Sequence, residues 1–330
     1  MSFRVGLVVQ NTTETNVMGR ALWAESQGYE DLWVGDGGGR MHALTLTGAM
    51  AGVTRNARLG MGIVPVFTHS PAVLASALMT INHIAPGRVV LGVGSSSQAM
   101  MENWNGIPFE KPLTRVKETV EVLRRMLKGE KVSFEGKSLR TEGFRLFWPM
   151  EQPPPIFMAA LRPKMLETAG EMADGVILHL VPPRVLPRVL EHIRIGAERS
   201  GRKLEDLEIA VRINTYVTED VSTAQEEFRQ VALGYFSTSV YNDFLAWCGF
   251  QDEAKQISDG FQARNREQTQ AAMTNALMDE LAVIGDQAHC QNALREIAAA
   301  GVNTLIVNPA SNHPDCVEAT CQAFTPGNFQ

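Results

Sequence analysis

The sequence has few cysteines, and none of them has a metal-binding spacing. Its four are Cys248, Cys290, Cys316 and Cys321, and no two of them form a CxxC motif. No histidine pair completes a zinc-binding spacing with them either. We therefore expect buried or half-exposed thiols in a reducing cytoplasm, with no bound metal.

Long apolar runs and clustered positive charge are also missing. No hydrophobic stretch approaches the ~20 residues that a membrane-spanning helix needs. The first ten residues read as a strand, without the charged segment and cleavage site of a secretory leader. Lysine and arginine total 30 against 36 acidic residues, a net charge of −6, and the basic residues are scattered. We expect a cytoplasmic protein that binds neither membranes nor nucleic acid.

The 330 residues do contain a regular alternation of short apolar runs with amphipathic helical segments. Eight such pairs predict a (β/α)8 TIM barrel, an α/β fold, as one domain over residues 1–330. A hairpin insertion is expected at 132–148 and a helical insertion at 218–282. The expected strands lie at residues 4–10, 31–36, 156–160, 175–180, 209–217 and 303–308, and two more begin near residues 58 and 87.

Two patterns indicate which ends of the strands carry function. Residues 58–97 read as strand, helix and strand, and both strands end in glycines, small hydroxyls, prolines and a histidine. Active sites of α/β barrels lie at the carboxyl ends of the strands. In 209–217, apolar residues alternate with Ala210, Arg212, Asn214 and Tyr216, which is typical of a strand with helices outside and a polar barrel interior.

The first candidate site is residues 159–165, where a strand runs directly into a helix. The free N–H groups of that helix, with Arg162 and Lys164 beside them, would suit a phosphate. An ordinary turn with surface basic residues explains the pattern equally well. The second candidate is residues 92–97, Gly-Val-Gly-Ser-Ser-Ser. Because a third glycine and a following acid are absent, this is no dinucleotide fingerprint, and a tight turn with a capping serine is the simpler interpretation.

The third candidate is a set of titratable side chains at strand ends. His42, His69 and His179 fall at or just beyond strand ends, whereas the other four histidines fall in helical runs. Asp36 ends a strand before the glycine run 37–39, where a carboxylate can orient a ligand or transfer a proton, or can simply begin a turn. The first strand has no His-x-His motif, and there is no Gly-x-Ser-x-Gly, so metal-dependent and serine hydrolases are excluded as interpretations.

Several of these motifs together resemble the luciferase-like superfamily, and within it the deazaflavin-dependent branch similar to methylenetetrahydromethanopterin reductase. The resemblance extends from about Val5 to Val307. It is carried by residues 67–72 (Phe-Thr-His-Ser-Pro-Ala), 87–94 (Gly-Arg-Val-Val-Leu-Gly-Val-Gly), 159–164 (Ala-Ala-Leu-Arg-Pro-Lys), 169–175 and 300–303.

The resemblance implies a barrel that binds coenzyme F420, or alternatively FMN, at the carboxyl ends of its strands. It implies a cis peptide between Gly62 and Ile63 that forms a bulge against the cofactor ring. It also implies that the cofactor is contacted by the following residues: Thr68, Gly94, Ser95, Ser96, Ser97, Ala160, Leu161, Arg162, Pro163 and Lys164. Asp36, His42, His69 and His179 are the candidates for proton transfer.

Three positions depart from the family pattern. His69-Ser70 stands where relatives often have Arg-His, Arg162 stands where they often have glycine, and Ser97 stands where the reductases often have an acid. A pterin substrate is therefore not implied. We expect an enzyme that transfers hydride to or from a small, apolar organic substrate, as a homodimer by analogy with the family. An FMN-dependent monooxygenase and a non-catalytic flavin-binding protein are the alternatives.

Overall fold

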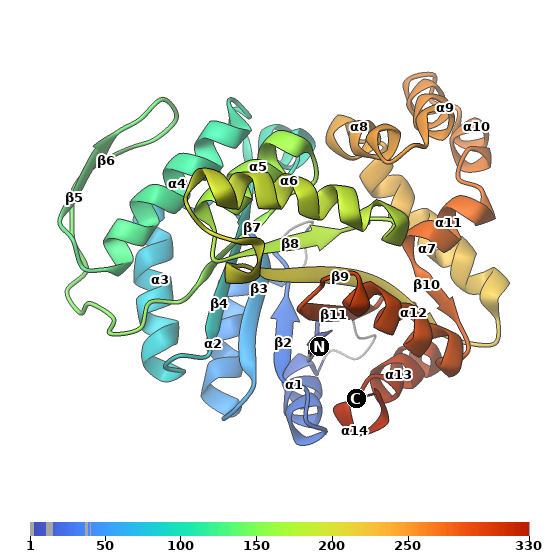
Figure 1. Ribbon diagram of the computed structural model, residues 1–330, viewed down its shortest axis with the longest axis horizontal. Helices are drawn as coiled ribbons and strands as arrows, with labels where there is room; N and C mark the ends of the chain where they lie inside the picture. The colour runs from blue at the N-terminus through green and yellow to red at the C-terminus, as the bar shows by residue number, and fades with distance from the viewer. Residues whose placement is uncertain (1–2, 11–15, 37–38, 40, 330) are drawn as a thin grey trace.

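The computed structural model describes residues 3–10, 16–36, 39 and 41–329, and within them eight parallel strands close into a barrel (Figure 1). Strand β9 pairs with both β8 and β11, which closes the sheet. The predicted (β/α)8 fold is confirmed. In barrel order the strands are β11 (Thr304–Pro309), β1 (Arg4–Val8), β2 (Asp31–Val34), β3 (Arg58–Pro65), β4 (Val89–Gly94), β7 (Ile156–Ala159), β8 (Gly175–His179) and β9 (Glu208–Val217).

Helices outside the barrel bury one face against the strands, as their apolar periodicity predicts. In α4, for example, Val116, Val120, Leu123 and Leu127 are all buried. The first helix is capped by the Asn16 side chain, which accepts a hydrogen bond from the Gly19 N–H. The outer helices are α1 (Val17–Ser26), α2 (Ala43–Val53), α3 (Pro71–Ile84), α4 (Pro112–Leu127), α5 (Pro163–Met172), α6 (Leu186–Arg199), α12 (Gln287–Ala299) and α13 (Pro314–Ala323).

Both expected insertions are present, and Figure 1 shows them on opposite sides of the barrel. The hairpin consists of β5 (Val132–Glu135) and β6 (Arg140–Phe144). The helical insertion contains α7 (Val221–Phe236), α8 (Ser239–Trp247), α9 (Gln251–Gln262), α10 (Arg266–Ala271) and α11 (Asn275–Leu281). Among the described residues, no helix combines the length and apolar character needed to cross a bilayer.

Three short elements differ from the sequence-based prediction. Strand β10 (Val283–Gly285) pairs with β9 and was not expected, because three residues are too few to show a period. After residue 97, where no regular element was expected, the chain forms a π-helical turn, η1 (Ala99–Trp104). A final helical turn, α14 (Pro326–Phe329), was also missed.

The barrel interior changes from apolar to polar toward the carboxyl ends of the strands. One apolar layer crosses the barrel and contains Val8, Trp33, Val90, Phe157, Ile177, Ala210 and Ile306. Because alternate residues of a strand share a face, the next inward residue is two positions further along. On β8, β9 and β11 these are His179, Arg212 and Asn308. The interior therefore becomes polar where barrel active sites are built.

The opposite end of the barrel is held by ion pairs around a buried aspartate. Asp31 is fully buried and accepts hydrogen bonds from Arg4 and Arg58 at 2.5–3.1 Å. Arg58 also donates to Glu208, which accepts from Thr304. These contacts join β1, β2, β3, β9 and β11, so they fix the relative positions of five of the barrel strands.

Candidate active site

A bulge in β3 forms one wall of the barrel mouth. The β3–β4 pairing shifts register between Met61 and Val64, and the Gly62–Ile63 peptide is cis, which confirms the prediction. The Ile63 side chain packs against the apolar layer. The Ile63 backbone carbonyl accepts a hydrogen bond from the Asp36 backbone N–H at 3.1 Å, so the bulge positions the residues that follow β2.

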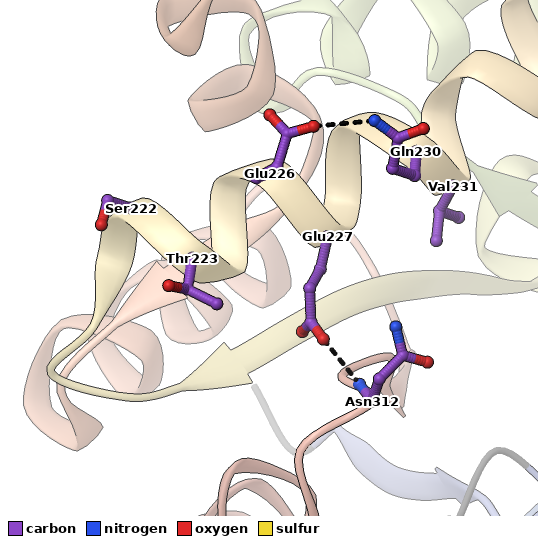
Figure 2. Close-up of a pocket in the computed structure, with 7 residues that line it drawn as sticks. All are labelled: Ser222, Thr223, Glu226, Glu227, Gln230, Val231 and Asn312. Carbon is purple, nitrogen blue, oxygen red and sulfur yellow. Dashed lines mark hydrogen bonds between the residues drawn. The ribbon is translucent and has the colours of Figure 1, made fainter.

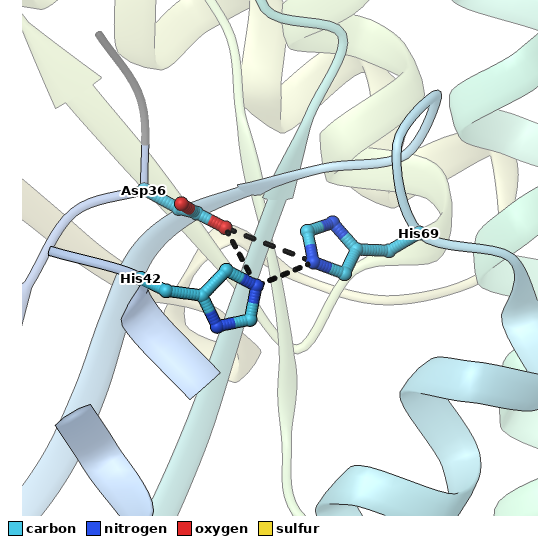
Figure 3. Close-up of side chains that lie close together, drawn as sticks. All are labelled: Asp36, His42 and His69. Atoms are coloured by element: carbon cyan, nitrogen blue, oxygen red, sulfur yellow. Dashed lines mark hydrogen bonds and ion pairs between the residues drawn. The ribbon is translucent and has the colours of Figure 1, made fainter. Parts of the chain in front are cut away.

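Asp36, His42 and His69 meet beside this bulge (Figure 3). His42 is the N-cap residue of α2, and His69 lies in the loop between β3 and α3. The two Nε2 atoms are 3.1 Å apart. Asp36 Oδ2 lies 3.9 Å from His42 Nε2 and 3.8 Å from His69 Nε2. Three residues predicted separately as proton-transfer candidates therefore form one cluster.

Hydrogen bonds on the far side of each imidazole orient both rings. His69 Nδ1 lies 3.2 Å from the Pro65 carbonyl and 2.9 Å from Thr68 Oγ1. A carbonyl can only accept, so His69 Nδ1 carries a proton and leaves a lone pair on Nε2. His42 Nδ1 lies 3.0 Å from Thr45 Oγ1 and 3.4 Å from the Thr45 backbone N–H.

His179 is the fourth proton-transfer candidate, and it lies elsewhere, on the β8–β9 side of the mouth. Its Nε2 accepts a hydrogen bond from Asn214 Nδ2 at 3.3 Å, and the Tyr235 ring meets it edge-on at a centroid distance of 5.1 Å. Burial, together with the positive charge of Arg212, lowers the pKa of His179 well below its ordinary value. This histidine is therefore neutral at physiological pH.

Arg212 and Tyr235 were not predicted as functional residues. Within the described part of the chain, the buried Nε of Arg212 has no hydrogen-bond partner. The only signal in the sequence was a charged residue on the polar side of a strand. Tyr235 comes from α7 of the helical insertion, so only the fold brings it to His179.

The predicted phosphate turn, residues 160–164, begins α5 as expected. No side chain caps this helix. Pro163 has no backbone N–H, and the Met165 N–H donates to the Arg162 carbonyl at 2.9 Å, so the Lys164 N–H is the first-turn donor left for a ligand. Arg162 forms an ion pair with Asp243 of α8 at 2.7 Å, and both side chains are about half exposed. The arginine is therefore already paired, which the sequence did not reveal because the two residues are 81 positions apart.

The hydroxyl groups predicted to contact a cofactor make local hydrogen bonds. Ser95 donates to the Ser96 carbonyl, and Ser96 donates to Met100 Sδ. Ser97 Oγ accepts from the Met100 N–H at 3.4 Å, which matches the capping-serine interpretation. Thr68 lies against His69, as described above. Their contact with a cofactor stays a prediction.

Two clefts lie away from the predicted residues. One of about 560 Å³ lies along α7 and is lined by Ser222, Thr223, Glu226, Glu227, Gln230, Val231 and Asn312 (Figure 2). Glu227 accepts hydrogen bonds there from Ser311 and the Asn312 N–H, so this carboxylate ties α7 to the loop after β11. The other, of about 480 Å³, lies between Phe67, Arg115 and the β5–β6 hairpin.

Comparison with known proteins identifies the family of this chain. The chain is 28% identical to the 5,10-methylenetetrahydromethanopterin reductase of Methanolobus tindarius over 87% of both chains. It is 25% identical to an oxidoreductase of Mycobacterium tuberculosis named as coenzyme F420-dependent, over 87% of this chain and 89% of that one. The structure of the coenzyme F420-dependent tetrahydromethanopterin reductase from Methanopyrus kandleri superimposes with a TM-score of 0.81 at 24% identity, covering 100% of this chain and 99% of that chain. The sequence pattern of the luciferase-like monooxygenases matches residues 3–304, and the protein belongs to this family of oxidoreductases.

Proposed function

We propose that the protein is a coenzyme F420-dependent oxidoreductase that transfers hydride between the deazaflavin and a small organic substrate. The observation that carries this proposal is the similarity, over 87% of this chain, to a relative that is named as coenzyme F420-dependent. One of the two sequence relatives is named for a pterin and the other for no particular substrate, and the departures at His69, Arg162 and Ser97 argue against carrying over a pterin. The homodimer implied by the family stays a prediction.

The residues at the barrel mouth fit such a cofactor. An apolar layer with Ile63 above it offers a surface for a planar ring. The Arg212 guanidinium, with an unpartnered buried Nε, suits an anionic or carbonyl-bearing ring edge. The uncapped start of α5, at residues 160–164, suits the phosphate. Gly94 and residues 95–97, at the end of β4, would line the space between them.

When bound, coenzyme F420 supplies the hydride at its ring. The protein's part is to hold the substrate against that ring, to exclude water and to contact its reacting polar atom. His42 and His69 present their Nε2 atoms beside the Ile63 bulge, so we assign them the contact with that atom. On the other side of the mouth, Tyr235 and Tyr241 of the helical insertion supply aromatic surface, which suits an apolar substrate.

The test is a titration of the purified protein with coenzyme F420 and, separately, with FMN, followed by fluorescence. We expect saturable binding of F420 and no comparable binding of FMN. Binding of FMN alone, with oxygen consumption when the flavin is reduced, would instead indicate a monooxygenase. Binding without turnover of any tested alcohol, aldehyde or enone would favour a non-catalytic flavin-binding protein.

A substitution sharpens the phosphate assignment. Asp243→Ala removes the carboxylate that pairs with Arg162, so the guanidinium becomes available to a phosphate. We expect F420 to bind about threefold more tightly, since exposed ion pairs are weak. Asp259→Ala is the matched control, because Asp259 is also an exposed helical aspartate paired with a cation, Lys255. Equal affinities for F420 in both variants would contradict a phosphate site at the start of α5.

A further inference from the structure

The cluster of Asp36, His42 and His69 has the composition of a transition-metal site. Two imidazole nitrogens and one carboxylate oxygen are a ligand set that Zn²⁺, Fe²⁺ and Co²⁺ all accept. All three donor atoms lie within 4.8 Å of one another. The residues come from the end of β2, the start of α2 and the loop after β3, so the barrel itself brings them together (Figure 3).

The spacing of the donor atoms is close to what an ion requires. Ligand atoms at ~2.0–2.1 Å from a tetrahedral Zn²⁺ lie about 3.3 Å from one another. The two Nε2 atoms are 3.1 Å apart, and Asp36 Oδ2 is 3.8 and 3.9 Å from them. A side-chain shift of less than about 1 Å would therefore bring the two Nε2 atoms and Asp36 Oδ2 to the spacing that an ion requires. Both Nε2 atoms already face the point between the three.

The Asp36 carboxylate gives a second, independent reason. Its Oδ2 is buried and has no hydrogen-bond partner in the part of the chain that the structure describes. Both imidazoles are too distant from it for a hydrogen bond. A buried, charged oxygen without a partner is costly, and a hydrogen-bonded histidine pair alone leaves it unexplained. A cation between the three atoms would satisfy it.

Groups around the ligands support the same assignment. Metal-bound histidines usually donate their second N–H to an oxygen, which fixes the ring and its tautomer. His69 already does so toward Pro65 and Thr68. His42 Nδ1 has Thr45 Oγ1 at 3.0 Å, which can accept the same bond when the ring carries its proton on Nδ1 rather than on Nε2.

We propose that Asp36, His42 and His69 bind a divalent transition-metal ion, with Zn²⁺ as the representative species. This departs from our sequence-based prediction of no metal, which considered only contiguous motifs. Three protein ligands leave a tetrahedral ion one position for water or a substrate oxygen. Beside the Ile63 bulge, that position would let the ion polarise a substrate carbonyl, so the two histidines would act on the reacting atom through the ion and not by direct contact. The binding itself does not depend on the identity of the cofactor.

The experiment uses the full-length protein, freed of metal by a chelator and then dialysed. We titrate it with Zn²⁺ against a chromogenic competitor, and with Co²⁺ followed by its visible d–d absorption. We expect one ion per chain and the intense Co²⁺ band of a four-coordinate site. His42→Ala, His69→Ala and Asp36→Asn should each weaken Zn²⁺ binding more than about tenfold. His83→Ala, which removes an exposed histidine of α3, should leave it unchanged.

Thr45→Val is the more specific probe, because it removes an exposed hydroxyl that touches no ion. It should weaken Zn²⁺ binding about tenfold through His42, and Thr68→Val should have less effect because His69 keeps the Pro65 carbonyl. Circular dichroism of each variant reports whether it is folded. Absence of stoichiometric binding, or equal binding in the folded His69→Ala variant, overturns the proposal.

The same metal-free protein is titrated with coenzyme F420, which separates this inference from the proposed function. If the protein binds F420 but no metal, the proposed function stands and only the metal site is overturned. If the protein binds a metal but not F420, the metal site stands and the proposed function is overturned.

Discussion

His179 should make the stability of the protein depend on pH in a predictable direction. It lies at the end of β8, opposite Arg212 in the strand register, with Asn214 donating to its Nε2 and Tyr235 against its ring. Burial is the main cause of its lowered pKa, and the charge of Arg212 adds to it. The native protein therefore holds this imidazole neutral at a pH at which a free histidine is protonated.

The sign and size of the change in the free energy of unfolding with pH follow from proton linkage. In the unfolded chain, a histidine has a pKa of about 6.5 and takes up a proton as the pH falls, whereas native His179 does not. The stabilisation is thus fully present above pH ~6.5 and is lost as the pH falls below it. Between pH 7.5 and pH 5.5, one such group lowers the free energy of unfolding by about 1.4 kcal/mol.

Urea denaturation of the parent protein and of His179→Gln at these two pH values measures the difference. Glutamine can still accept the hydrogen bond from Asn214 but does not titrate. We expect the decrease between pH 7.5 and pH 5.5 to be about 1.4 kcal/mol smaller in the variant. His83→Gln is the control, since His83 is exposed, and it should keep the parental decrease. An equal decrease in all three proteins would refute the neutral state of His179.

Two further substitutions test the framework that supports the site. Asp31→Asn removes a charge from the buried cluster with Arg58, and should lower the free energy of unfolding by about 3 kcal/mol in urea denaturation, because it leaves a buried guanidinium with less compensation. Gly92→Ala should cost about 2 kcal/mol in the same assay, since an added Cβ would collide with the Met61 carbonyl and with Ile177 Cδ1 behind the bulge.

Controls for both lie in the helical insertion. Asp252→Asn changes an exposed aspartate of α9 and should alter the free energy of unfolding by less than about 0.5 kcal/mol. Gly234→Ala, on α7, adds a Cβ that meets nothing within 4 Å, and should stabilise the helix slightly. If either core substitution costs no more than its control, the described packing is wrong.

Much of the fold could be predicted from the sequence because its signals are local. Eight apolar runs, each followed by an amphipathic helix, leave few alternatives to a barrel. The alternation in 209–217 correctly placed Ile209, Val211 and Ile213 against the helices and Ala210 inside. Element ends were less well predicted. Strand β2 ends at Val34 rather than Asp36, which leaves this carboxylate outside the sheet, where it can face the histidines.

The contacts within the site could not be predicted in the same way. The sequence placed Asp36, His42 and His69 near strand ends, but eight loops meet at that end of a barrel. Whether two of their side chains touch depends on details such as His42 being the N-cap residue of α2. The pair formed by Arg162 and Asp243 depends on the path of the helical insertion, for which no local pattern exists.

The two sets of polar side chains at the barrel mouth lie on different kinds of element, and this difference suggests a different role for each. Asp36, His42 and His69 lie in and beside loops, and His42 has about half of its side chain exposed. His179 and Arg212 lie on strands, directly above the apolar layer. Strand positions are held more rigidly than loop positions, so the β8–β9 side is suited to fix a planar ring. The loop residues can adjust by the fraction of an ångström that an ion or a substrate oxygen requires. We therefore assign contact with the cofactor ring to the strand residues, and contact with the reacting atom of the substrate to the side of the mouth that carries His42 and His69.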